Sequence, residues 1–476
     1  MFRSLLFPVV AILGLALQPA CVAAGEKPPN IVLFFADDLG WTGLDCFGSD
    51  FYETPNLDRL AGAGMKFTDA YAACTVCSPS RAALMTGMYP ARLRLTTFIP
   101  GQNRPYAKLQ IPDWTMGLEP ELTTIAEALG AGGYRTSHIG KWHLSFPGEK
   151  QDPTKHGFDF SQDKPAGTRG YHLSKKVQQA LDTDSGYLTD YFAELAADQI
   201  AAAGEDPFFL YFAFHVPHTP IQGRADLVEA FKGKVDAAAL HQNPTYAAMV
   251  KSMDQAVGRV VAALDAAGKA EDTIIIFTSD NGGLTQRYGK HDGFTENLPL
   301  RRGKGSAYEG GVRVPTIVRW PGVTAPGSVC DEPVMGIDFY PTLLEVAGLA
   351  GDPEHNKKVD GRSLVPLLKN ADTTLDRDLF WHFPHYHAGG DSPYSAIRSG
   401  DWRLIEFHED GALELYHLSD DLGEQDNLAS RKGDLAKRLQ QKLHAWRTAV
   451  GAQMPKPNPN FDPARQTQVA RGKRKK

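Results

Sequence analysis

Cys77 and Arg81 are the two residues whose types and spacing most directly suggest chemistry. They belong to the run Cys-Ser-Pro-Ser-Arg and are four positions apart, so on a helix both side chains project from one face. Pro79 has a fixed φ and no amide hydrogen, which suits a first helical turn, so we expect Cys77 at the helix N-terminus. Helix N-termini bind anions, and the run therefore predicts a nucleophile beside an anion site. A disulfide-bonded or buried cysteine beside a surface arginine is the alternative.

Acidic and amide side chains follow two apolar runs of the sequence. Asp37 and Asp38 close one run, and Asp280 and Asn281 close another. Three carboxylates and one amide oxygen from two strand ends make an all-oxygen site, which suits calcium or magnesium, and an oxidised form of Cys77 would complete it. Either pair alone is as readily explained as a cap of a turn or helix. Together the two pairs predict a cation site.

Basic and histidine side chains follow further apolar runs. Lys141 and His143 come directly after one run, and His218 lies between two prolines after another. Lys304 belongs to the turn Arg-Arg-Gly-Lys-Gly, whose glycines permit the backbone to approach an anion closely. Each motif alone has another explanation, in which its lysine or histidine is a solvated loop residue beside a core residue such as Trp142. At the carboxyl ends of neighbouring strands, these residues would line one cleft.

Taken in order, these motifs resemble those of the type I sulfatases, and the match runs from residue 31 to residue 315. The resemblance is to sulfatases of the arylsulfatase A and N-acetylgalactosamine sulfatase type, which have an alkaline phosphatase-like fold. It implies that a formylglycine-generating enzyme oxidises Cys77 to Cα-formylglycine and that one calcium ion is bound. It implies catalytic roles for Cys77, Arg81, Lys141, His143, His218 and Lys304, and metal ligation by Asp37, Asp38, Cys77, Asp280 and Asn281.

The resemblance also implies a mechanism. One hydroxyl of the formylglycine hydrate attacks sulfur while His218 protonates the departing alcohol oxygen. The cation, Arg81, Lys141 and Lys304 neutralise the sulfate oxygens. His143 then acts as the base that releases sulfate through the second hydroxyl and regenerates the aldehyde. A chain without the modification is accordingly expected to be almost inactive.

The elements that must position these residues alternate along most of the chain. Apolar runs rich in β-branched and aromatic residues alternate with helical patterns. This alternation predicts an α/β fold with a large, mostly parallel sheet sandwiched by helices, and chemistry at the carboxyl ends of its strands. The expected strands are 31–36, 134–139, 208–214, 273–278 and 314–320, and the expected helices are 122–129, 188–203, 246–267 and 339–346.

The pattern changes after about residue 372. Runs separated by turn signals predict an antiparallel sheet, followed by a long helix, in a smaller C-terminal α+β domain. The strands are expected at 379–383, 394–399, 402–407 and 413–418, and the helix at 428–450. The expected parts are a signal peptide (1–24), a catalytic domain (25–372), a C-terminal subdomain (373–462) and a basic, disordered tail (463–476). Segments 95–119 and 151–185 fit no regular pattern and are expected at the rims of a cleft.

The composition is that of an ordinary globular protein, with 476 residues, 42% of them hydrophobic and 22% charged. The formal net charge is −6. Because residues 465–476 hold six basic and no acidic residues, the rest of the chain carries −12. An acidic body repels polyanions, which argues against a nucleic-acid partner. A sulfated substrate would therefore need basic residues in its cleft.

The first 24 residues are typical of a secretory signal peptide. They carry Arg3 as their one charged side chain, then an apolar stretch over 5–17 that is too short for a membrane span. The mature protein is therefore expected to be periplasmic or secreted, without a stable membrane anchor. Four cysteines remain, too few for a disulfide framework, and conversion of Cys77 leaves thiols for at most one bridge, whose pairing stays open. They are Cys46, Cys74, Cys77 and Cys330.

Export and a polar cleft favour a sulfated carbohydrate as the substrate, of the galactose or N-acetylgalactosamine sulfate type by resemblance. Candidate sugar contacts are Arg104, Lys108, Trp114, His382, His385 and His387. One alternative is a phosphomonoester or phosphonate-ester hydrolase of the same superfamily, which would bind two zinc ions and for which Asp378, His382 and His385 have a usable spacing. A non-catalytic sulfated-glycan-binding protein is the other. The sequence leaves open the sugar, the sulfate position, exo or endo action, and the oligomeric state.

Overall fold

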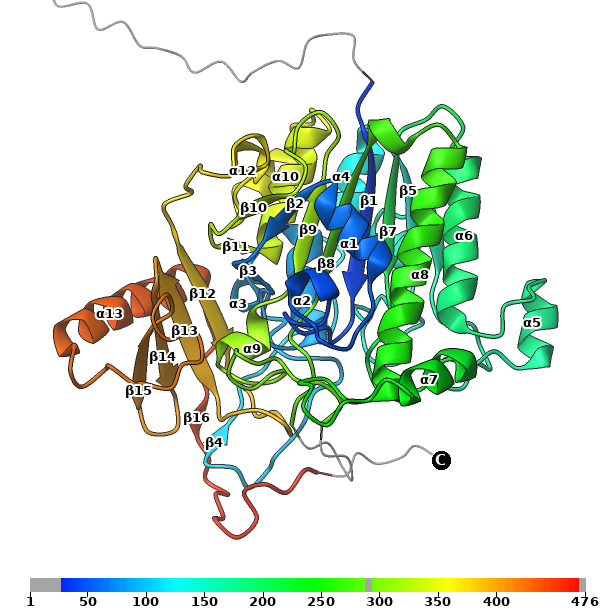
Figure 1. The fold of residues 1–476 in the computed structure, drawn as a ribbon. Helices are drawn as coiled ribbons and strands as arrows, with labels where there is room; N and C mark the ends of the chain where they lie inside the picture. The colour runs from blue at the N-terminus through cyan, green and yellow to red at the C-terminus, as the bar shows by residue number, and fades with distance from the viewer. Residues whose placement is uncertain (1–26, 287–292, 471–476) are drawn as a thin grey trace, which may run out of the picture.

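The computed structural model describes residues 27–286 and 293–470 (Figure 1). The predicted signal peptide and residues 471–476 of the predicted tail lie outside the described residues. A large sheet flanked by helices forms most of the molecule, and a smaller antiparallel sheet with one long helix lies beside it. This architecture confirms the predicted fold class.

The large sheet has eight strands. They are β1 (Asn30–Ala36), β2 (Met65–Phe67), β5 (Arg135–Gly140), β6 (Phe160–Gln162), β7 (Phe208–Ala213), β8 (Thr273–Ser279), β9 (Thr316–Arg319) and β10 (Ser328–Cys330). Across the sheet their order is β10-β2-β9-β8-β1-β7-β5-β6. All neighbours from β8 to β6 pair in parallel, whereas β9 is antiparallel to β8 and β2. The carboxyl ends of five consecutive strands therefore meet at one edge.

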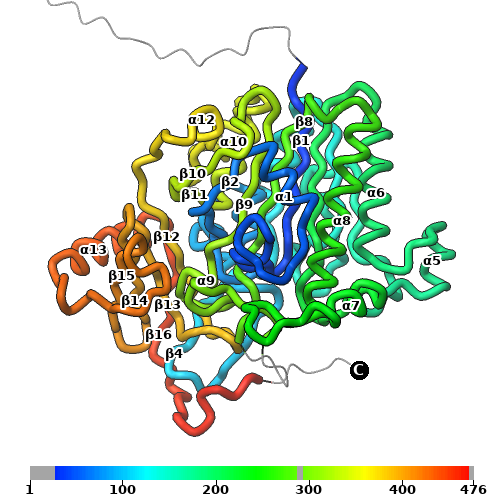
Figure 2. The backbone as a smooth tube through the Cα atoms, in the orientation of Figure 1, coloured from blue at the N-terminus to red at the C-terminus, as the bar shows by residue number. Residues whose placement is uncertain are grey.

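Helices cover both faces of this sheet (Figures 1 and 2), because alternate residues of a strand point to opposite sides. Val32 and Phe34 of β1 belong to the core on one face, and Ile31 and Leu33 to the core on the other. The first face is covered by α1 (Pro55–Gly62), α6 (Leu188–Ala202) and α8 (Pro244–Ala266), and the second by α2 (Cys77–Thr86), α4 (Ile125–Ala131), α10 (Phe339–Val346) and α12 (Val365–Lys369). Because both faces of the sheet are covered by apolar side chains, polar groups that take part in chemistry must lie at the ends of the strands.

The C-terminal sheet is an antiparallel meander with a long helix on one face. Its strands are β12 (Asp378–Phe383), β13 (Tyr394–Ser399), β14 (Trp402–Phe407) and β15 (Leu413–His417), and the helix is α13 (Gly433–Val450). Leu439 and Leu443 of α13 pack on Leu404. On the other face, Trp381 packs on the large domain and donates its indole N–H to the carbonyl oxygen of Ala72 (2.9 Å). The expected boundary at 372/373 falls in the connection between α12 and β12.

The described chain also contains shorter strands and α-helices. They are β3 (Ala70–Tyr71), β4 (Leu109–Gln110), β11 (Val334–Met335), β16 (Lys456–Pro457), α3 (Pro90–Leu93), α5 (Lys175–Leu181), α7 (Ala225–Lys232), α9 (Glu309–Val312) and α11 (Pro353–Asn356). The strand β16 pairs with β4 and so returns the chain end to segment 95–119. Segment 151–185 is less irregular than its sequence indicates, because β6 adds to the sheet edge and α5 forms a short helix.

Two further expectations differ from the structure. The strand expected at 314–320 is shorter and runs antiparallel to its neighbours. The long helix expected from 428 begins at Gly433, because Leu428 instead donates its N–H to the carbonyl oxygen of Leu415.

The four cysteines of the described chain form no disulfide, so the one bridge that the sequence allows is not formed. The free thiols are those of Cys46, Cys74, Cys77 and Cys330. Among the described residues, no helix is both long and apolar enough to cross a membrane.

A buried network of ion pairs joins the C-terminal sheet to the large domain. Arg403 of β14 is fully buried, and its guanidinium lies 3.0 Å from Glu309 of α9 and 3.3 Å from Glu424. Arg398 of β13 lies 2.7 Å from Asp69 of the large domain. Charges removed from water must be paired, so the network fixes how this sheet docks. It also anchors α9, which directly follows the loop that carries Lys304.

Replacing Arg403 by methionine should leave Glu309 and Glu424 buried without this counter-charge. We expect the free energy of unfolding to fall by about 3–5 kcal/mol, measured by urea denaturation with tryptophan fluorescence. Arg431→Met is the control, because Arg431 pairs with Asp426 at an exposed position, where an ion pair contributes about 0–1 kcal/mol. Equal losses in the two variants would contradict the role of the network.

Candidate active site

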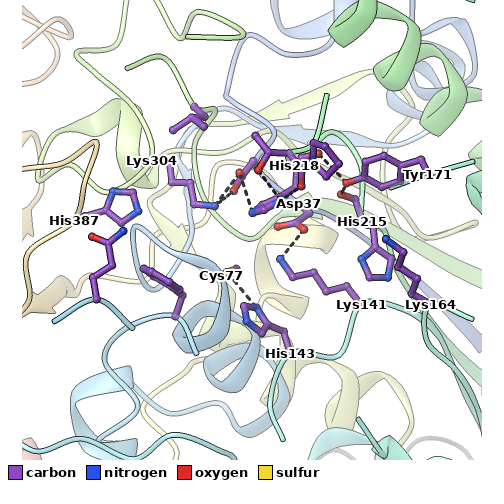
Figure 3. Close-up of a pocket in the computed structure, with 16 residues that line it drawn as sticks. Asp37, Cys77, Lys141, His143, Lys164, Tyr171, His215, His218, Lys304 and His387 are labelled. Carbon is purple, nitrogen blue, oxygen red and sulfur yellow. Dashed lines mark hydrogen bonds and ion pairs between the residues drawn. The ribbon is translucent and has the colours of Figure 1, made fainter. Parts of the chain in front are cut away.

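A cavity of about 330 Å³ opens at the carboxyl edge of the large sheet (Figure 3). Residues that follow β1, β7, β5 and β6, which are neighbours in the sheet, contribute to its walls. The structure thus brings together residues that are far apart in sequence. The sequence-predicted residues that line the cavity are Asp37, Asp38, Cys77, Lys141, His143, His218, Lys304 and His387.

Cys77 is the first residue of α2, the position that the following proline predicts. Its thiol is almost fully buried, and Sγ lies 3.4 Å from Nδ1 of His143. Nε2 of His143 lies 2.8 Å from the carbonyl oxygen of Ile99, so Nε2 carries the proton and Nδ1 faces the thiol as an acceptor. Burial, assisted by the nearby Lys141 ammonium, lowers the pKa of His143 to about 3. The ring is therefore neutral at physiological pH.

The predicted oxygen ligands form one cluster. Asp37 and Asp38 follow β1, while Asp280 and Asn281 follow β8, and the two strands are paired along their whole length. The backbone N–H of Asp38 donates to Oδ1 of Asp280 (3.1 Å), and Nδ2 of Asn281 donates to Oδ1 of Asp38 (2.8 Å). All four side chains are buried, so their charges are poorly screened by water.

This oxygen cluster fits a cation. Oδ1 of Asp37 and Oδ1 of Asn281 are buried yet accept no hydrogen bond. One ligand atom each of Asp37, Cys77 and Asp280 lies within 4.8 Å of the others. Burial, together with the neighbouring Asp37, raises the pKa of Asp280 well above its usual range, and a bound cation would relieve this repulsion. Hard oxygen donors of this kind suit calcium or magnesium.

Two lysines balance part of the negative charge. Nζ of Lys141 lies 2.6 Å from Asp37, and Nζ of Lys304 lies 2.6 Å from Asp38. Burial alone would raise the pKa of Asp37, but the neighbouring positive charges, of which Lys141 acts most strongly, together outweigh it and hold that pKa well below its usual range. Lys141 follows Gly140, which has φ 107° and where a Cβ would lie 1.8 Å from a backbone oxygen of β7. Only glycine fits this approach of the two strands.

The loop that carries Lys304 is held by backbone hydrogen bonds. The N–H of Lys304 donates to Gly283 and that of Gly305 donates to Thr75, both at 3.0 Å. Gly305 has φ 84°, and a Cβ there would lie 2.1 Å from the ring of His387. This glycine therefore allows the loop to pack against a histidine, whereas the sequence suggests that it allows the approach of an anion.

Arg81 lies beneath the cluster and does not line the cavity. Its guanidinium is fully buried, donates twice to Oδ2 of Asp280 (3.1 and 2.7 Å), and donates once to the carbonyl oxygen of Lys141 (2.9 Å). Each of its three nitrogens thus serves a protein group, as burial requires. Arg81 therefore has no place in the cavity wall, and its expected role in neutralising the sulfate oxygens stays a prediction. This geometry makes Arg81 the counter-charge that holds Asp280 in place.

His218 follows β7 and lies beside the cluster, across the cavity from His143 (Figure 3). Its Nδ1 lies 2.7 Å from the carbonyl oxygen of Thr219, so Nδ1 carries the proton, and Nε2 lies 3.7 Å from Oδ2 of Asp38. Burial lowers the pKa of His218 to about 4, although Asp37 and Asp38 act to raise it. The neutral ring therefore directs a lone pair at the cluster.

Backbone strain coincides with these groups. Asp38 has φ 65° and His143 has φ 60°, a left-handed conformation that costs free energy in residues other than glycine. Strained residues of this kind persist where the surrounding structure imposes the conformation, and they gather at functional sites. Here one carries a cluster carboxylate and the other faces the thiol.

Of the six candidate sugar contacts, all of them within the described residues, one lines the cavity, namely His387. Arg104 supports it from behind by donating to the carbonyl oxygen of His387 (2.8 Å). Lys108 is exposed outside the cavity, and Trp114 lies against the ring of His385 rather than in the cavity. The sequence does not separate the one residue that lines the cavity from those that lie behind or outside it, and the assignment of sugar contacts stays a prediction.

His382 and His385 are internal hydrogen-bonding residues. The ring nitrogens of His382 contact Ser395 (2.8 Å) and the carbonyl oxygen of Gln453 (3.0 Å), and His385 contacts Thr96 (2.8 Å). The described residues form two groups of possible metal ligands, and both contain Asp37. Neither histidine belongs to them, so the zinc site considered for a phosphate-ester hydrolase does not assemble.

Sequence reasoning misses half of the cavity wall. Several missed residues come from segments 95–119 and 151–185, which are expected at the cleft rims, so the segments are predictable but their cavity-facing residues are not. Two of the missed residues could have been found from their positions in the sequence, because His215 and Lys164 each lie two residues beyond the end of a parallel strand. The missed residues are Phe98, Gln102, Lys164, Tyr171, His215, Thr219, Pro220 and Leu284.

The fold and the site define an alkaline phosphatase-like hydrolase, in which a mostly parallel sheet presents at one edge a carboxylate cluster that fits a cation. Comparison with known families makes the assignment specific. The sulfatase family model matches residues 29–349, and the model for the C-terminal part of N-sulphoglucosamine sulphohydrolase matches residues 303–449. The chain therefore belongs to the sulfatase family, and it is a sulfuric ester hydrolase.

Individual relatives agree with this assignment. Arylsulfatase A of Homo sapiens is 34% identical, over 90% of this chain and 86% of its own length. N-acetylgalactosamine-6-sulfatase of Rattus norvegicus is 32% identical, over 80% of this chain and 72% of its own length. Among solved structures, that of Ps i-CgsB in complex with k-i-k-neocarrahexaose has a TM-score of 0.74 at 28% identity, covering 91% of this chain and 95% of that one.

We expect calcium to bind the oxygen cluster and stabilise the folded chain. Protein stripped with EDTA should unfold at a higher temperature once calcium is added, because a ligand at 100 times its Kd contributes about 2.7 kcal/mol. Asp280→Asn should remove most of this gain in differential scanning calorimetry. Asp338→Asn is the matched control, since Asp338 is equally buried and pairs with Arg377, but lies outside the cluster. Equal gains in both variants would contradict the site.

Proposed function

We propose that this sulfatase hydrolyses sulfate monoesters of carbohydrates, of the galactose or N-acetylgalactosamine type, with Cys77 converted to formylglycine and one calcium ion in the oxygen cluster. The observation that carries the proposal is that Cys77, His143 and two lysines meet around buried carboxylates in one cavity. The relative named N-acetylgalactosamine-6-sulfatase and the solved relative in complex with a neocarrahexaose support a sugar substrate.

The proposed nucleophile is residue 77. Formylglycine supplies, as its hydrate, a nucleophilic hydroxyl and a second hydroxyl through which the aldehyde is restored. His143 is suited to accept a proton there, because its unprotonated Nδ1 lies 3.4 Å from the side chain of residue 77. Its lowered pKa keeps it in this accepting form. We therefore assign His143 as the base.

Lys141 and Lys304 are the proposed partners of the sulfate oxygens. Both line the cavity, and their ammonium groups converge on the carboxylates beside Cys77. Positive charge held in place before the reaction stabilises the negative charge that develops in the transition state. Calcium, when bound by Asp37, Asp38, Asp280 and Asn281, would add Lewis-acid polarisation of the sulfate.

His218 is the proposed acid for the departing alcohol oxygen. Its Nε2 faces the cluster, while Nδ1–H is bonded to Thr219. It can donate a proton into the cavity only when Nε2 is protonated, and the charges of Asp37 and Asp38 favour that state against the effect of burial. The same ring therefore takes up a proton between turnovers and returns it to the leaving group.

Conversion of Cys77 must precede folding. The thiol is 3% exposed in the folded chain, so a formylglycine-generating enzyme could not reach it there. The modification is thus expected on the nascent or unfolded chain, before or during the export that residues 1–24 direct. The mature enzyme is expected in the periplasm or outside the cell, where sulfated polysaccharides are degraded.

Sulfate release from a panel of sulfated monosaccharides tests the proposed function. The panel contains galactose and N-acetylgalactosamine sulfated at single positions, with the phosphate esters of the same sugars as controls. We expect release of sulfate from at least one sulfated sugar and no release of phosphate. Release of phosphate alone would favour the phosphate-ester hydrolase, and binding of sulfated sugars without turnover would favour a glycan-binding protein.

Lys304→Ala should impair catalysis far more than it impairs folding. Removing one charge-stabilising group from a preorganised site lowers kcat by about 10²–10³-fold. Lys108→Ala is the control, because Lys108 is exposed outside the cavity and should leave kcat and KM nearly unchanged. Steady-state kinetics on the best sugar of the panel measures both variants. Similar kinetics in both would remove Lys304 from the site.

A further inference from the structure

Lys164 is a cation of the cavity that the proposed chemistry does not use. It lines the cavity together with Lys141 and Lys304 (Figure 3). Those two lysines are paired with carboxylates of the cluster at 2.6 Å. Lys164 forms no ion pair with any described residue, and its Nζ lies 5.8 Å from the centre of the Tyr171 ring. Its positive charge is therefore available to a ligand.

The register of the sheet explains where Lys164 lies. β6 is parallel to β5, with Gln162 opposite Ile139. Lys141 and Lys164 each lie two residues beyond this pair, so they leave the same edge of the sheet from neighbouring strands, which are about 4.8 Å apart. In strand order Lys164 is one step further than Lys141 from β1, which carries the oxygen cluster. Figure 3 shows it on the side of the cavity away from His387.

Neighbouring residues anchor the backbone that carries Lys164. Nε2 of His215 donates to Oδ1 of the preceding residue, Asp163 (3.1 Å). Burial would raise the pKa of Asp163, but the interactions with His215 and with the backbone N–H of Lys164 together outweigh it and lower that pKa to about 2. The hydroxyl of Tyr171 donates to the carbonyl oxygens of His215 and His218, both at 2.7 Å. Lys164 is thus carried by a segment tied to the residues after β7.

We propose that Lys164 binds a second anionic group of the glycan, a sulfate or a carboxylate, beside the sulfate that is cleaved. The inference rests on the proposed function, since it concerns the same cavity and the same substrate. The cleaved sulfate has its own partners in Lys141 and Lys304, so a further cation one strand away has no role toward it. The body of the chain is acidic, and an unpaired ammonium at the cavity wall therefore creates a local attraction for anions.

Matched substrates with one and two anionic groups test this inference. The probes are N-acetylgalactosamine 6-sulfate, N-acetylgalactosamine 4,6-disulfate, and the 6-sulfate linked to a uronic acid, or the corresponding galactose compounds. Lys164→Gln removes the charge but keeps a polar chain, and Lys164→Arg keeps the charge. Lys175→Gln is the control, because Lys175 is an exposed lysine of the same segment outside the cavity.

We expect Lys164→Gln to lower kcat/KM about fivefold for a substrate with two anionic groups and to leave the singly charged substrate unchanged. Added salt should then affect the doubly charged substrate less than it does in the wild type. Lys164→Arg and Lys175→Gln should retain wild-type preference.

The arms of the experiment separate the outcomes. A loss confined to the disulfate identifies a second sulfate, a loss confined to the uronic acid compound identifies a carboxylate, and either supports the proposal. Equal change for all probes, or no change, overturns it while leaving the proposed function intact. Failure of the wild type to release sulfate from any of these probes and from any sugar of the panel would overturn both.

Discussion

Three buried carboxylates at one sheet edge are the constraint on which this structure depends. Asp37, Asp38 and Asp280 are brought together because β1 and β8 are neighbours, and their mutual repulsion in a poorly hydrated site must be offset. Arg81 offsets it from beneath, and Lys141 and Lys304 offset it from the cavity side. The unsatisfied oxygens that remain mark the place proposed for a cation. The same arrangement leaves the ammonium groups of two lysines at the cavity wall, where we propose that they pair with an anionic ester.

The cavity depends on both parts of the chain. The large domain provides the cluster, the thiol and the histidines, while the C-terminal part provides His387, which packs on the loop of Lys304. The buried pairing of Arg403 with Glu309 holds the C-terminal sheet to the element that follows this loop. A change at that interface is therefore expected to shift Lys304, the proposed partner of the sulfate, even though no residue of the network lines the cavity.

Most of the fold and much of the site could be predicted from the sequence, because both depend on local patterns. Buried parallel strands have continuous apolar sequences, and their next residues must lie at one edge, which places Asp37, Lys141 and His218 together. What could not be predicted is how deeply each side chain is buried and which groups it contacts. The spacing of Arg81 from Cys77 shows that they share a helix face, but not that this face is covered by Asp280. Likewise, the sequence of β12 does not reveal that both ring nitrogens of His382 are hydrogen-bonded, to Ser395 and Gln453. The sequence after β6 does not reveal that Lys164 lines the cavity.

The most direct test of the site is the relation between sulfatase activity and the fraction of Cys77 that is converted. Preparations made with and without a formylglycine-generating enzyme provide different fractions, which the mass of the tryptic peptide 67–81 measures, since an aldehyde in place of the thiol group lowers that mass. We expect activity to rise in proportion to the converted fraction and to vanish where Cys77 remains a thiol. Full activity in preparations whose Cys77 is entirely unconverted would contradict the chemistry assigned to this site.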